Sequence, residues 1–355
     1  MLGLTHPVVR GLFLFVILGA TVGCQGKFPR VGEPSRSFSV RYVSTVTDLT
    51  PGAEFAMWVP VPHDDPYQAV GKIRVDAPVE WRIETGSTYG NTMLYLGGVA
   101  PAESFDVTVE YDVDRYRYVT AAAGSAPVAA QPTTGRVDEV YLQPSSLCVV
   151  NDDVRKMARE LAPADASPLE KARAFYGHVA EQMSYGKPTD LPWGRGDTMY
   201  ACDARIGNCT DFHSYFISLC LAEGIPARFQ IGIFGAYEEK AEEYKTGGYH
   251  CWAEFHDPDL GWVPVDISEA DKISHDDPTR RYEYFGMHTD NRVTLSTGRD
   301  LILSPRQQGA PLNYFVYPYV EVDGRPHAGA TKVSYWRERT DTEEEPNRAA
   351  RSSGY

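Results

Sequence analysis

The sequence lacks any run rich in lysine and arginine. Its 355 residues contain 34 Lys and Arg against 48 Asp and Glu, so the formal net charge at pH 7 is −14. Proteins that bind nucleic acid neutralise phosphates with clustered basic side chains. This composition therefore argues against nucleic acid, and against other anionic polymers, as a partner. We also find no internal repeat.

The apolar run near the N-terminus is too short to span a bilayer. Arg10 precedes the apolar segment 11–18, and small residues then lead to Cys24. A transmembrane helix needs about 20 apolar residues, whereas this arrangement is typical of an export signal. Residues 21–24, Thr-Val-Gly-Cys, resemble the lipobox of bacterial lipoproteins. The resemblance implies a signal peptide over 1–24, a lipid on Cys24 and a membrane anchor on the periplasmic or cell-surface side; a plain cleaved secretory signal is the alternative.

Cysteine is infrequent, with six residues in the chain. If Cys24 carries a lipid, five remain, namely Cys148, Cys202, Cys209, Cys220 and Cys251. An odd number in an exported protein leaves at least one thiol free, or pairs it between chains. This odd number is consistent with one free and reactive cysteine. The disulfide pairing of the others stays open, because spacing does not determine it.

The first part of the chain alternates between apolar and polar residues. The pattern is clearest in 104–113, where every second residue is apolar, as in a half-buried strand. Similar runs, separated by Gly, Pro and Asp, cover 38–46, 54–61, 70–75, 81–85 and 92–96. We therefore predict an N-terminal antiparallel β-sandwich over residues 36–118. Residues 119–137, rich in Ala, Gly, Pro and Thr, are predicted to be a linker.

The next part carries helical patterns first and strand patterns afterwards. Periodicity and capping residues predict helices at 152–161, from Ser167, and from Cys209 to about Gly224. Strand-like runs follow at 227–234, 249–256, 261–267, 292–303 and 313–322, with an exposed, mobile excursion at 237–248. These patterns predict a second domain of α+β class over 138–336, with a strand-rich C-terminal extension. The charged residues 337–355 are predicted to be disordered.

Cys209 stands at the start of a helix whose apolar stripe includes Phe212, Phe216 and Leu219. A thiol in this position lies near unpaired amide groups and the positive end of the helix dipole, both of which favour the thiolate. We therefore expect Cys209 to be the most nucleophilic thiol of the chain. The alternative is a buried structural cysteine.

His250 and Asp266 lie on neighbouring predicted strands. Side chains alternate along 249–256, so His250 and Cys251 point to opposite faces and Cys251 is expected to be a packed residue of little consequence. A turn at 258–261 would fold the next strand back and set Asp266 beside His250. There the carboxylate could fix the imidazole's tautomer and stabilise its charged form. The alternative for Asp266 is a solvated loop acid.

A zinc site is the main alternative to this interpretation, because the chain has residues of zinc-ligand type at Cys202, Cys209, His213, Cys220 and His250. The spacing argues against it. Cys202 and Cys209 are separated by six residues, whereas zinc knuckles use a shorter interval.

Other residues near Cys209 admit more than one role. His213 lies one helical turn further on and is a competing base, although a packing role is favoured because it lacks an orienting carboxylate. Gly207 is expected to allow close approach of a substrate backbone, or is a turn glycine. The Cys209 amide is expected to stabilise an oxyanion, with Trp193 or Tyr200 as a candidate side-chain donor.

Together these segments resemble the transglutaminase-like superfamily, which has a papain-like Cys-His-Asp fold. The matching motifs are Gly207-Asn208-Cys209 with its helix, Gly224-Ile225-Pro226-Ala227-Arg228, His250-Cys251-Trp252-Ala253-Glu254 and Gly261-Trp262-Val263-Pro264-Val265-Asp266. The resemblance covers about residues 140–290, and the β-rich region before it resembles the sandwiches that accompany bacterial members. It implies Cys209 as nucleophile, His250 as base and acid, and Asp266 as the residue that orients His250.

Two details qualify the resemblance. Cys251 follows the histidine where alanine is usual. The calcium sites of animal transglutaminases have no match, so neither a metal nor another cofactor is expected.

The resemblance implies an exported thiol acyl-transfer enzyme that acts on peptide or glutamine-type amide bonds of a protein or peptide substrate. A cysteine peptidase or amidase is favoured, by analogy with bacterial members. One alternative is a protein-crosslinking transglutaminase. Another is a non-catalytic surface binding protein on the same fold.

Overall fold

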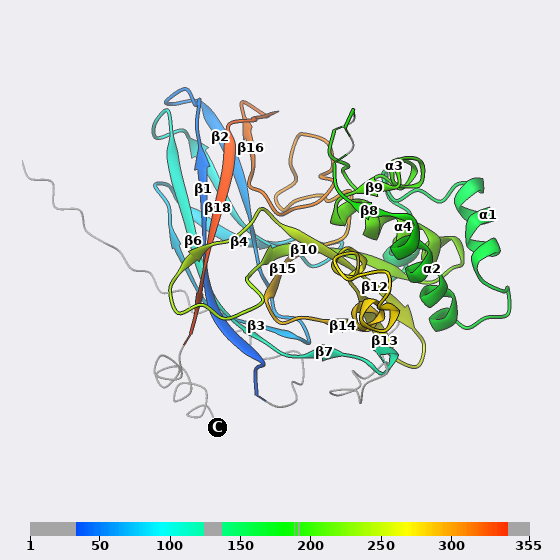
Figure 1. Cartoon of the computed structure of the whole chain (residues 1–355). Coiled ribbons are helices and arrows are strands. Elements are labelled where there is room, and N and C mark those ends of the chain that lie inside the picture. Colours follow the sequence, from blue (N-terminus) through cyan, green and yellow to red (C-terminus); the bar gives the residue numbers. More distant parts are fainter. Residues whose placement is uncertain (1–32, 124–136, 188, 191, 340–355) are drawn as a thin grey trace, which may run out of the picture.

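A β-sandwich and an α+β unit make up the protein. The computed structural model describes residues 33–123, 137–187, 189–190 and 192–339. Figure 1 shows the four-stranded sheet of the α+β unit between the sandwich and the main helices. The predicted α+β class with an N-terminal antiparallel sandwich is confirmed. The predicted signal peptide with Cys24, and most of the predicted linker and tail, lie outside the described residues.

The sandwich begins with six strands, β1 (Arg36–Val46), β2 (Glu54–Val61), β3 (Gln68–Asp76), β4 (Trp81–Thr85), β5 (Thr92–Val99) and β6 (Phe105–Arg115). β1, β6 and β3 are neighbours in one antiparallel sheet, and β2, β5 and β4 in the other. Every second residue of β1 is buried, which turns Phe38, Val40 and Tyr42 into the core between the sheets.

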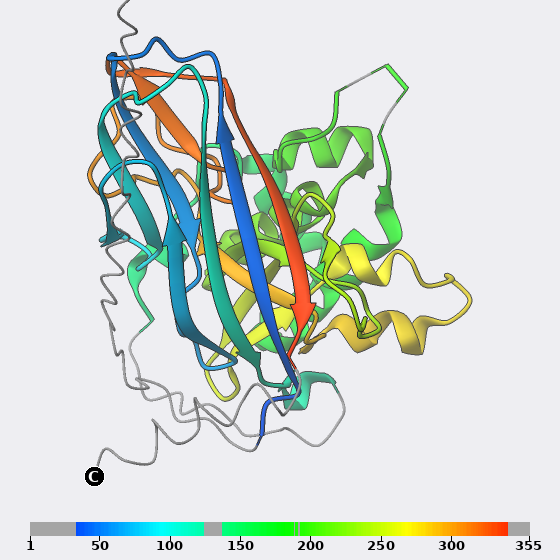
Figure 2. The same cartoon turned by 90° about the vertical axis from the view of Figure 1, so that its left-hand side faces the viewer.

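Three strands from the C-terminal end complete the sandwich, β16 (Tyr319–Val322), β17 (Arg325–Pro326) and β18 (Ala330–Glu338). β16 pairs with β2, and β18 pairs antiparallel with β1, beside which it lies in Figure 2. The prediction that placed residues 138–336 in the second domain is therefore wrong for these strands, and β18 also enters the segment 337–355 that we expected to be disordered. Alternation along a sequence indicates a strand, but its partner depends on side chains far away in the chain.

Trp336 on β18 tests whether this late strand stabilises the sandwich. Its ring is fully buried and stacks on Phe38 with 3.6 Å between centroids. We expect Trp336→Ala to lower the free energy of unfolding by about 3–5 kcal/mol, the usual cost of truncating a buried tryptophan. The exposed Trp81, on β4 of the same sandwich, is the matched control. Thermal and denaturant unfolding measure both variants, and equal effects would contradict the central place of β18.

Two short strands tie the domains together. β7 (Tyr118–Val119) pairs with β14 (Met287–His288), so the start of the predicted linker is part of a two-stranded sheet. β11 (Tyr244–Lys245) pairs with β18, so the excursion at 237–248 is anchored at the sandwich edge.

The α+β unit combines four helices with one sheet, and the last of these helices packs directly on that sheet. The helices are α1 (Asp152–Leu161), α2 (Pro168–Gln182), α3 (Thr198–Ala204) and α4 (Cys209–Ala222), and the sheet has the order β13 (Gly261–Val265), β12 (His250–Asp257), β10 (Ala227–Phe234) and β15 (Arg292–Thr297). The helix predicted from Ser167 is α2, and Ser167 and Glu170 form a capping box at its start. Residues 209–221 of α4 are all buried, as expected for a helix enclosed by a sheet and other helices.

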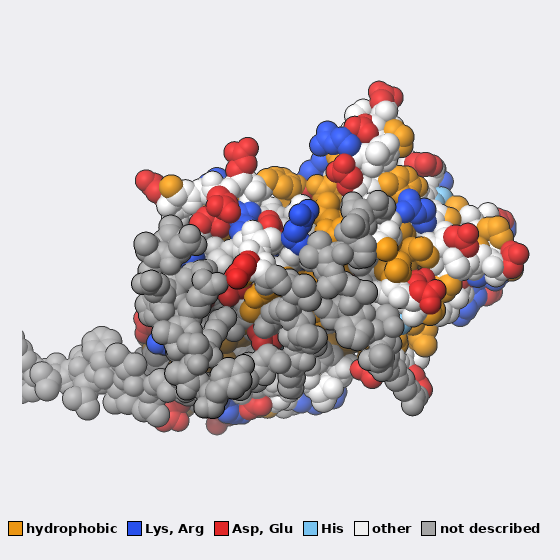
Figure 3. Space-filling model, turned by 90° about the horizontal axis from the view of Figure 1, so that it is seen from below, with side chains coloured by type: hydrophobic (Ala, Val, Ile, Leu, Met, Phe, Trp, Pro, Cys, Tyr) orange, Lys and Arg blue, Asp and Glu red, His pale blue; other side chains and the backbone are white. Residues whose placement is uncertain are grey.

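The remaining short elements are η1 (Ala121–Ala123), η2 (Glu139–Leu142), β8 (Ser184–Tyr185), β9 (Ile206–Gly207), α5 (Ile267–Ala270), α6 (Pro278–Arg281) and η3 (Tyr282–Tyr284). None of the helices in the described ranges is both long and apolar enough to span a membrane. On the face shown in Figure 3, the described Lys and Arg side chains are interspersed with Asp and Glu.

Candidate active site

The start of α4 is held by two capping residues. Asn208 Oδ1 accepts a hydrogen bond from the Thr210 amide at 2.8 Å, and the Asp211 carboxylate accepts one from the Asn208 amide at 2.9 Å. This capping box satisfies amides that lack a partner in the first helical turn. The helix begins at Cys209, as predicted, so that residue lies at the positive end of the helix dipole.

Asp211 also connects α4 to the loop before α3. Its Oδ1 accepts a hydrogen bond from the Gly196 amide at 2.8 Å, and the side chain is fully buried. A Cβ at Gly207 would lie 2.6 Å from Asp211 Oδ2. Gly207 therefore leaves room for this carboxylate, which differs from the substrate contact that we expected for it. The sequence signal for Asp211 is its place three residues after the cap Asn208.

His250 and Asp266 meet at neighbouring strand ends. β12 and β13 form the expected antiparallel pair, and Asp266 follows directly after β13. His250 Nε2 lies 2.8 Å from Asp266 Oδ2. The other carboxylate oxygen accepts from the Ser268 hydroxyl at 3.2 Å and the Glu269 amide at 3.3 Å, because Asp266 is also the N-cap of α5. The carboxylate is thus fixed at both oxygens, and His250 Nδ1 is the ring nitrogen left for another partner.

Arg292 is a further partner of Asp266. Its NH1 donates to Asp266 Oδ2 at 2.9 Å, and both side chains are fully buried. Burial alone would raise the pKa of Asp266, but the charges of His250 and Arg292 hold it well below its usual range. The Trp252 ring packs against the guanidinium, with 4.8 Å between Arg292 Cζ and the ring centroid. Arg292 carries no signal in the sequence, because it opens an ordinary strand-like run.

A second carboxylate stands near His250. Glu269 Oε1 is 3.8 Å from His250 Nε2, but the same oxygen accepts from Lys272 Nζ at 2.5 Å and its partner oxygen accepts from the Tyr237 hydroxyl. Both Glu269 oxygens are thus occupied by donors closer than His250. Asp266 is therefore the carboxylate that orients the imidazole.

Cys209 and His250 each stabilise the charged form of the other. Hydrogen bonds from the Cys251 thiol and from His250 outweigh the effect of burial and lower the pKa of Cys209 to about 5. Burial opposes a charged imidazole, yet the Asp266 carboxylate and the contact with Cys209 raise the pKa of His250. The site therefore favours the thiolate form of Cys209 and the charged form of His250.

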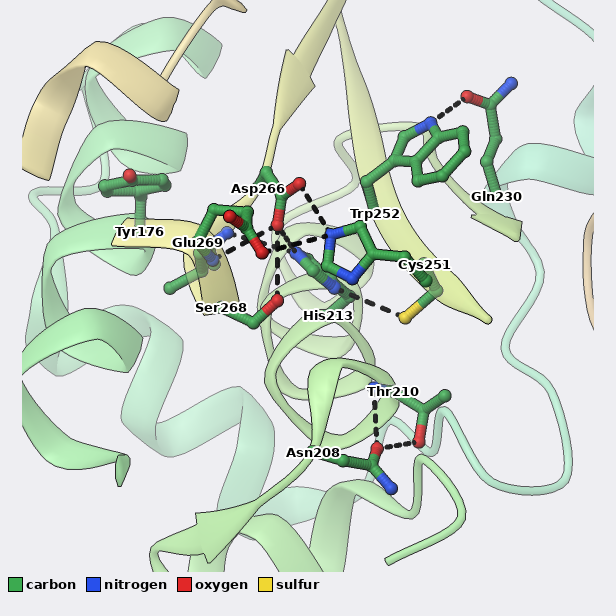
Figure 4. Close-up of polar contacts among 12 residues, drawn as sticks. Tyr176, Asn208, Thr210, His213, Gln230, Cys251, Trp252, Asp266, Ser268 and Glu269 are labelled. Carbon is green, nitrogen blue, oxygen red and sulfur yellow. Dashed lines mark hydrogen bonds and ion pairs between the residues drawn. The ribbon is translucent and has the colours of Figure 1, made fainter. Parts of the chain in front are cut away.

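Cys251 lies at the site, contrary to our expectation. We predicted that it would point away from His250 without consequence, but the face it points to is covered by the start of α4. Its thiol lies close enough to Cys209 for each to shift the pKa of the other. It also contacts His213, with 3.5 Å between Cys251 Sγ and His213 Nδ1 (Figure 4). Side chains do alternate along β12, but α4 packs on the face to which Cys251 points.

His213 is held inside the fold. Its Nε2 accepts a hydrogen bond from the Ile267 amide at 3.1 Å, and burial lowers its pKa to about 4. The ring is therefore a neutral packing and hydrogen-bonding residue, in agreement with the role that we favoured over that of a base.

The other residues weighed for the site lie elsewhere or serve the surrounding loops. Tyr200 donates its hydroxyl to the Pro192 carbonyl at 3.1 Å, while Trp193 is about half exposed beside Tyr185. Cys202 contacts Tyr215, and burial raises the pKa of Cys220 well above its ordinary value. Across the part of the chain that the structure describes, the five cysteines are free and no group of three His, Cys, Asp or Glu side chains is arranged to hold a metal ion.

Comparison with known sequences places this site in a recognised domain. The model of the transglutaminase-like superfamily matches residues 155–267. An uncharacterized protein of Haemophilus influenzae is 27% identical over 300 residues, which cover 76% of this chain and 81% of that protein. A protein-glutamine gamma-glutamyltransferase of Pseudomonas aeruginosa is 29% identical over 122 residues, which cover 33% of this chain but only 18% of that protein.

A solved structure extends the likeness beyond the matched domain. The crystal structure of a candidate cysteine protease from Cytophaga hutchinsonii aligns with a TM-score of 0.55 and 15% identity over 86% of this chain and 92% of that one. At such low identity the likeness concerns the fold. The family match thus assigns residues 155–267, rather than the whole chain, to the transglutaminase-like superfamily.

Proposed function

We propose that this protein is a cysteine hydrolase or acyltransferase that cleaves peptide or glutamine-type amide bonds. Within this class we favour a cysteine peptidase or amidase. The observation that carries the proposal is the 2.8 Å contact of His250 Nε2 with Asp266 Oδ2, beside a thiol at the start of α4. A thiol nucleophile, a base within reach of it and a group that orients the base are the parts that covalent acyl transfer requires.

The first half-reaction breaks the amide. The Cys209 thiolate attacks the carbonyl carbon, forming the carbon–sulfur bond as the carbonyl electrons move to oxygen. The Cys209 amide at the helix start is the proposed donor to that oxyanion. When the intermediate collapses, the carbon–nitrogen bond breaks, the His250 imidazolium gives its proton to the leaving amine, and a thioester remains on Cys209.

The second half-reaction restores the thiol site. Neutral His250 accepts a proton from water, and the resulting hydroxide attacks the thioester carbonyl. The carbon–sulfur bond then breaks, the acid leaves, and the thiolate and imidazolium are paired again. The net change consumes one water for each amide cleaved. Asp266, which Arg292 holds through a hydrogen bond, keeps the imidazole in place throughout.

A panel of peptides and glutamine donors, with and without a primary amine, tests the proposal. Hydrolysis predicts amine or ammonia release that does not depend on the added amine. If wild type and Cys209→Ala release the same amount from every substrate, the protein is a binding module on this fold. The panel thus separates enzyme from non-catalytic protein.

A crosslinking transglutaminase is the second candidate. It is supported by the partial likeness to the protein-glutamine gamma-glutamyltransferase, which spans 122 residues. In that reaction an amine replaces water in the second half-reaction and a new amide forms. Incorporation of a labelled amine into a glutamine donor, at the expense of hydrolysis, would favour this candidate over the peptidase.

We also propose that the mature protein is exported and anchored to a membrane through a lipid on Cys24. The motif at residues 21–24 supports this. In a bacterial host, the wild type is expected in the membrane fraction with a lipid-modified N-terminus by mass spectrometry, and Cys24→Ala in the soluble exported fraction. An unmodified wild-type N-terminus cleaved elsewhere would instead indicate a plain secretory signal.

A further inference from the structure

A second thiol lies against the proposed nucleophile. Cys251 is fully buried on β12, next to His250 in the chain, and its side chain and backbone both lie close enough to the Cys209 thiol to lower the pKa of that thiol. The mechanism above makes no use of it. Its role can be derived from the hydrogen bonds that surround it, and the inference rests on the proposed function of Cys209.

His213 determines the direction of these hydrogen bonds. The Ile267 amide donates to His213 Nε2 at 3.1 Å, so Nε2 carries a lone pair. Because the ring is neutral, its one proton is on Nδ1. Nδ1–H faces the Cys251 sulfur at 3.5 Å. His213 is therefore a donor toward Cys251, and cannot accept the Cys251 proton.

The sulfur of Cys209 is then an acceptor for the Cys251 proton. Burial raises the pKa of the Cys251 thiol well above its ordinary value, so it keeps its proton when Cys209 is ionised. The chain of donors runs from the Ile267 amide to His213, from His213 to Cys251 and from Cys251 to Cys209.

We infer that Cys251 is a positioning residue that donates its S–H to the Cys209 thiolate, while His213 holds the Cys251 sulfur in place. The donor stabilises the nucleophile's charged form before substrate binds. Beyond His250, the other titratable groups that feel the Cys209 charge are Tyr185, Tyr249, Tyr314, Tyr317 and Asp211. Burial raises the pKa of these tyrosines, so they add no charge beside the thiolate, and the negative charge of Asp211 opposes it.

The test is the pH dependence of Cys209 alkylation by iodoacetamide in the full chain, read by peptide mass spectrometry so that each cysteine is separate. The wild-type rate is expected to be half-maximal near pH 5. Cys251→Ala removes the donor and should raise this midpoint by about one unit, which is about a fivefold lower rate at pH 5. Cys251→Ser keeps a donor of similar size and should stay near the wild-type midpoint.

Cys220→Ala is the matched control, because Cys220 is a second buried thiol, on α4 itself. It should leave the Cys209 midpoint unchanged, and thermal unfolding confirms that each variant is folded. An unshifted midpoint in Cys251→Ala, or an equal shift in Cys251→Ser, overturns the inference. Alkylation needs no substrate, so this result is independent of whether the substrate panel finds turnover.

Discussion

Replacing Cys209 with alanine is expected to lower kcat/KM for amide cleavage by about 10⁴-fold or more. The substitution removes the atom that forms the thioester, and no other thiol can take its place. Cys251 is the nearest, but burial raises its pKa well above the ordinary value, so it stays protonated. The measurement is release of amine from the best substrate of the panel, under conditions in which substrate is far below saturation.

Stability should change little in this variant, which separates a chemical loss from a folding loss. Cys220→Ala, in the same buried helix, is expected to retain wild-type activity because its thiol lies in the core away from His250. Comparable turnover by Cys209→Ala and wild type would exclude Cys209 as nucleophile, and an equal loss in Cys220→Ala would assign the effect to packing of α4.

The features that the sequence predicts best are those decided within one or two neighbouring elements. The start of α4 is visible because Asn208 and Asp211 cap it, and capping acts over four residues. The approach of His250 to Asp266 follows from a short antiparallel pair with a tight turn, in which Gly261 has a φ of 75°. Local rules are sufficient for both.

The features that escape prediction depend on elements distant in the chain. Arg292 reaches Asp266 from β15, and Cys251 meets Cys209 because α4 lies across β12. The pairing of β18 with β1 joins residues nearly the whole chain apart. In each case the local pattern shows an ordinary strand, and only the assembled fold identifies the contact.

Changing Asp266 to asparagine should have the second largest effect on activity, lowering kcat by about 10³- to 10⁴-fold. The wild-type carboxylate accepts from four donors: His250 and Arg292 at one oxygen, Ser268 and the Glu269 amide at the other. In asparagine, one of the two oxygens is replaced by an NH2 group, which donates and cannot accept. In either orientation of the side chain, two of the four donors would then face another donor and lose their acceptor. His250 would also lose the negative charge that raises its pKa.

Two consequences beyond kcat distinguish this variant. The imidazolium becomes less stable, so the Cys209 alkylation midpoint should move to higher pH. Arg292 is left as a buried charge without its partner, and breaking such a pair costs about 3–5 kcal/mol of folding free energy. Alkylation profiles and denaturant unfolding measure the two effects separately.

Asp277→Asn is the matched control for the variant at Asp266. Asp277 is likewise the N-cap of a four-residue helix, α6, where its carboxylate accepts from the Arg280 amide at 3.1 Å. The same substitution there should cost about 1 kcal/mol or less and leave kcat and the Cys209 midpoint unchanged, because no catalytic group contacts it. If Asp266→Asn lost stability but kept the wild-type kcat and midpoint, Asp266 would be a structural cap alone. Loss of kcat with a shifted midpoint, set against an unaffected Asp277→Asn, would assign it the orientation of His250.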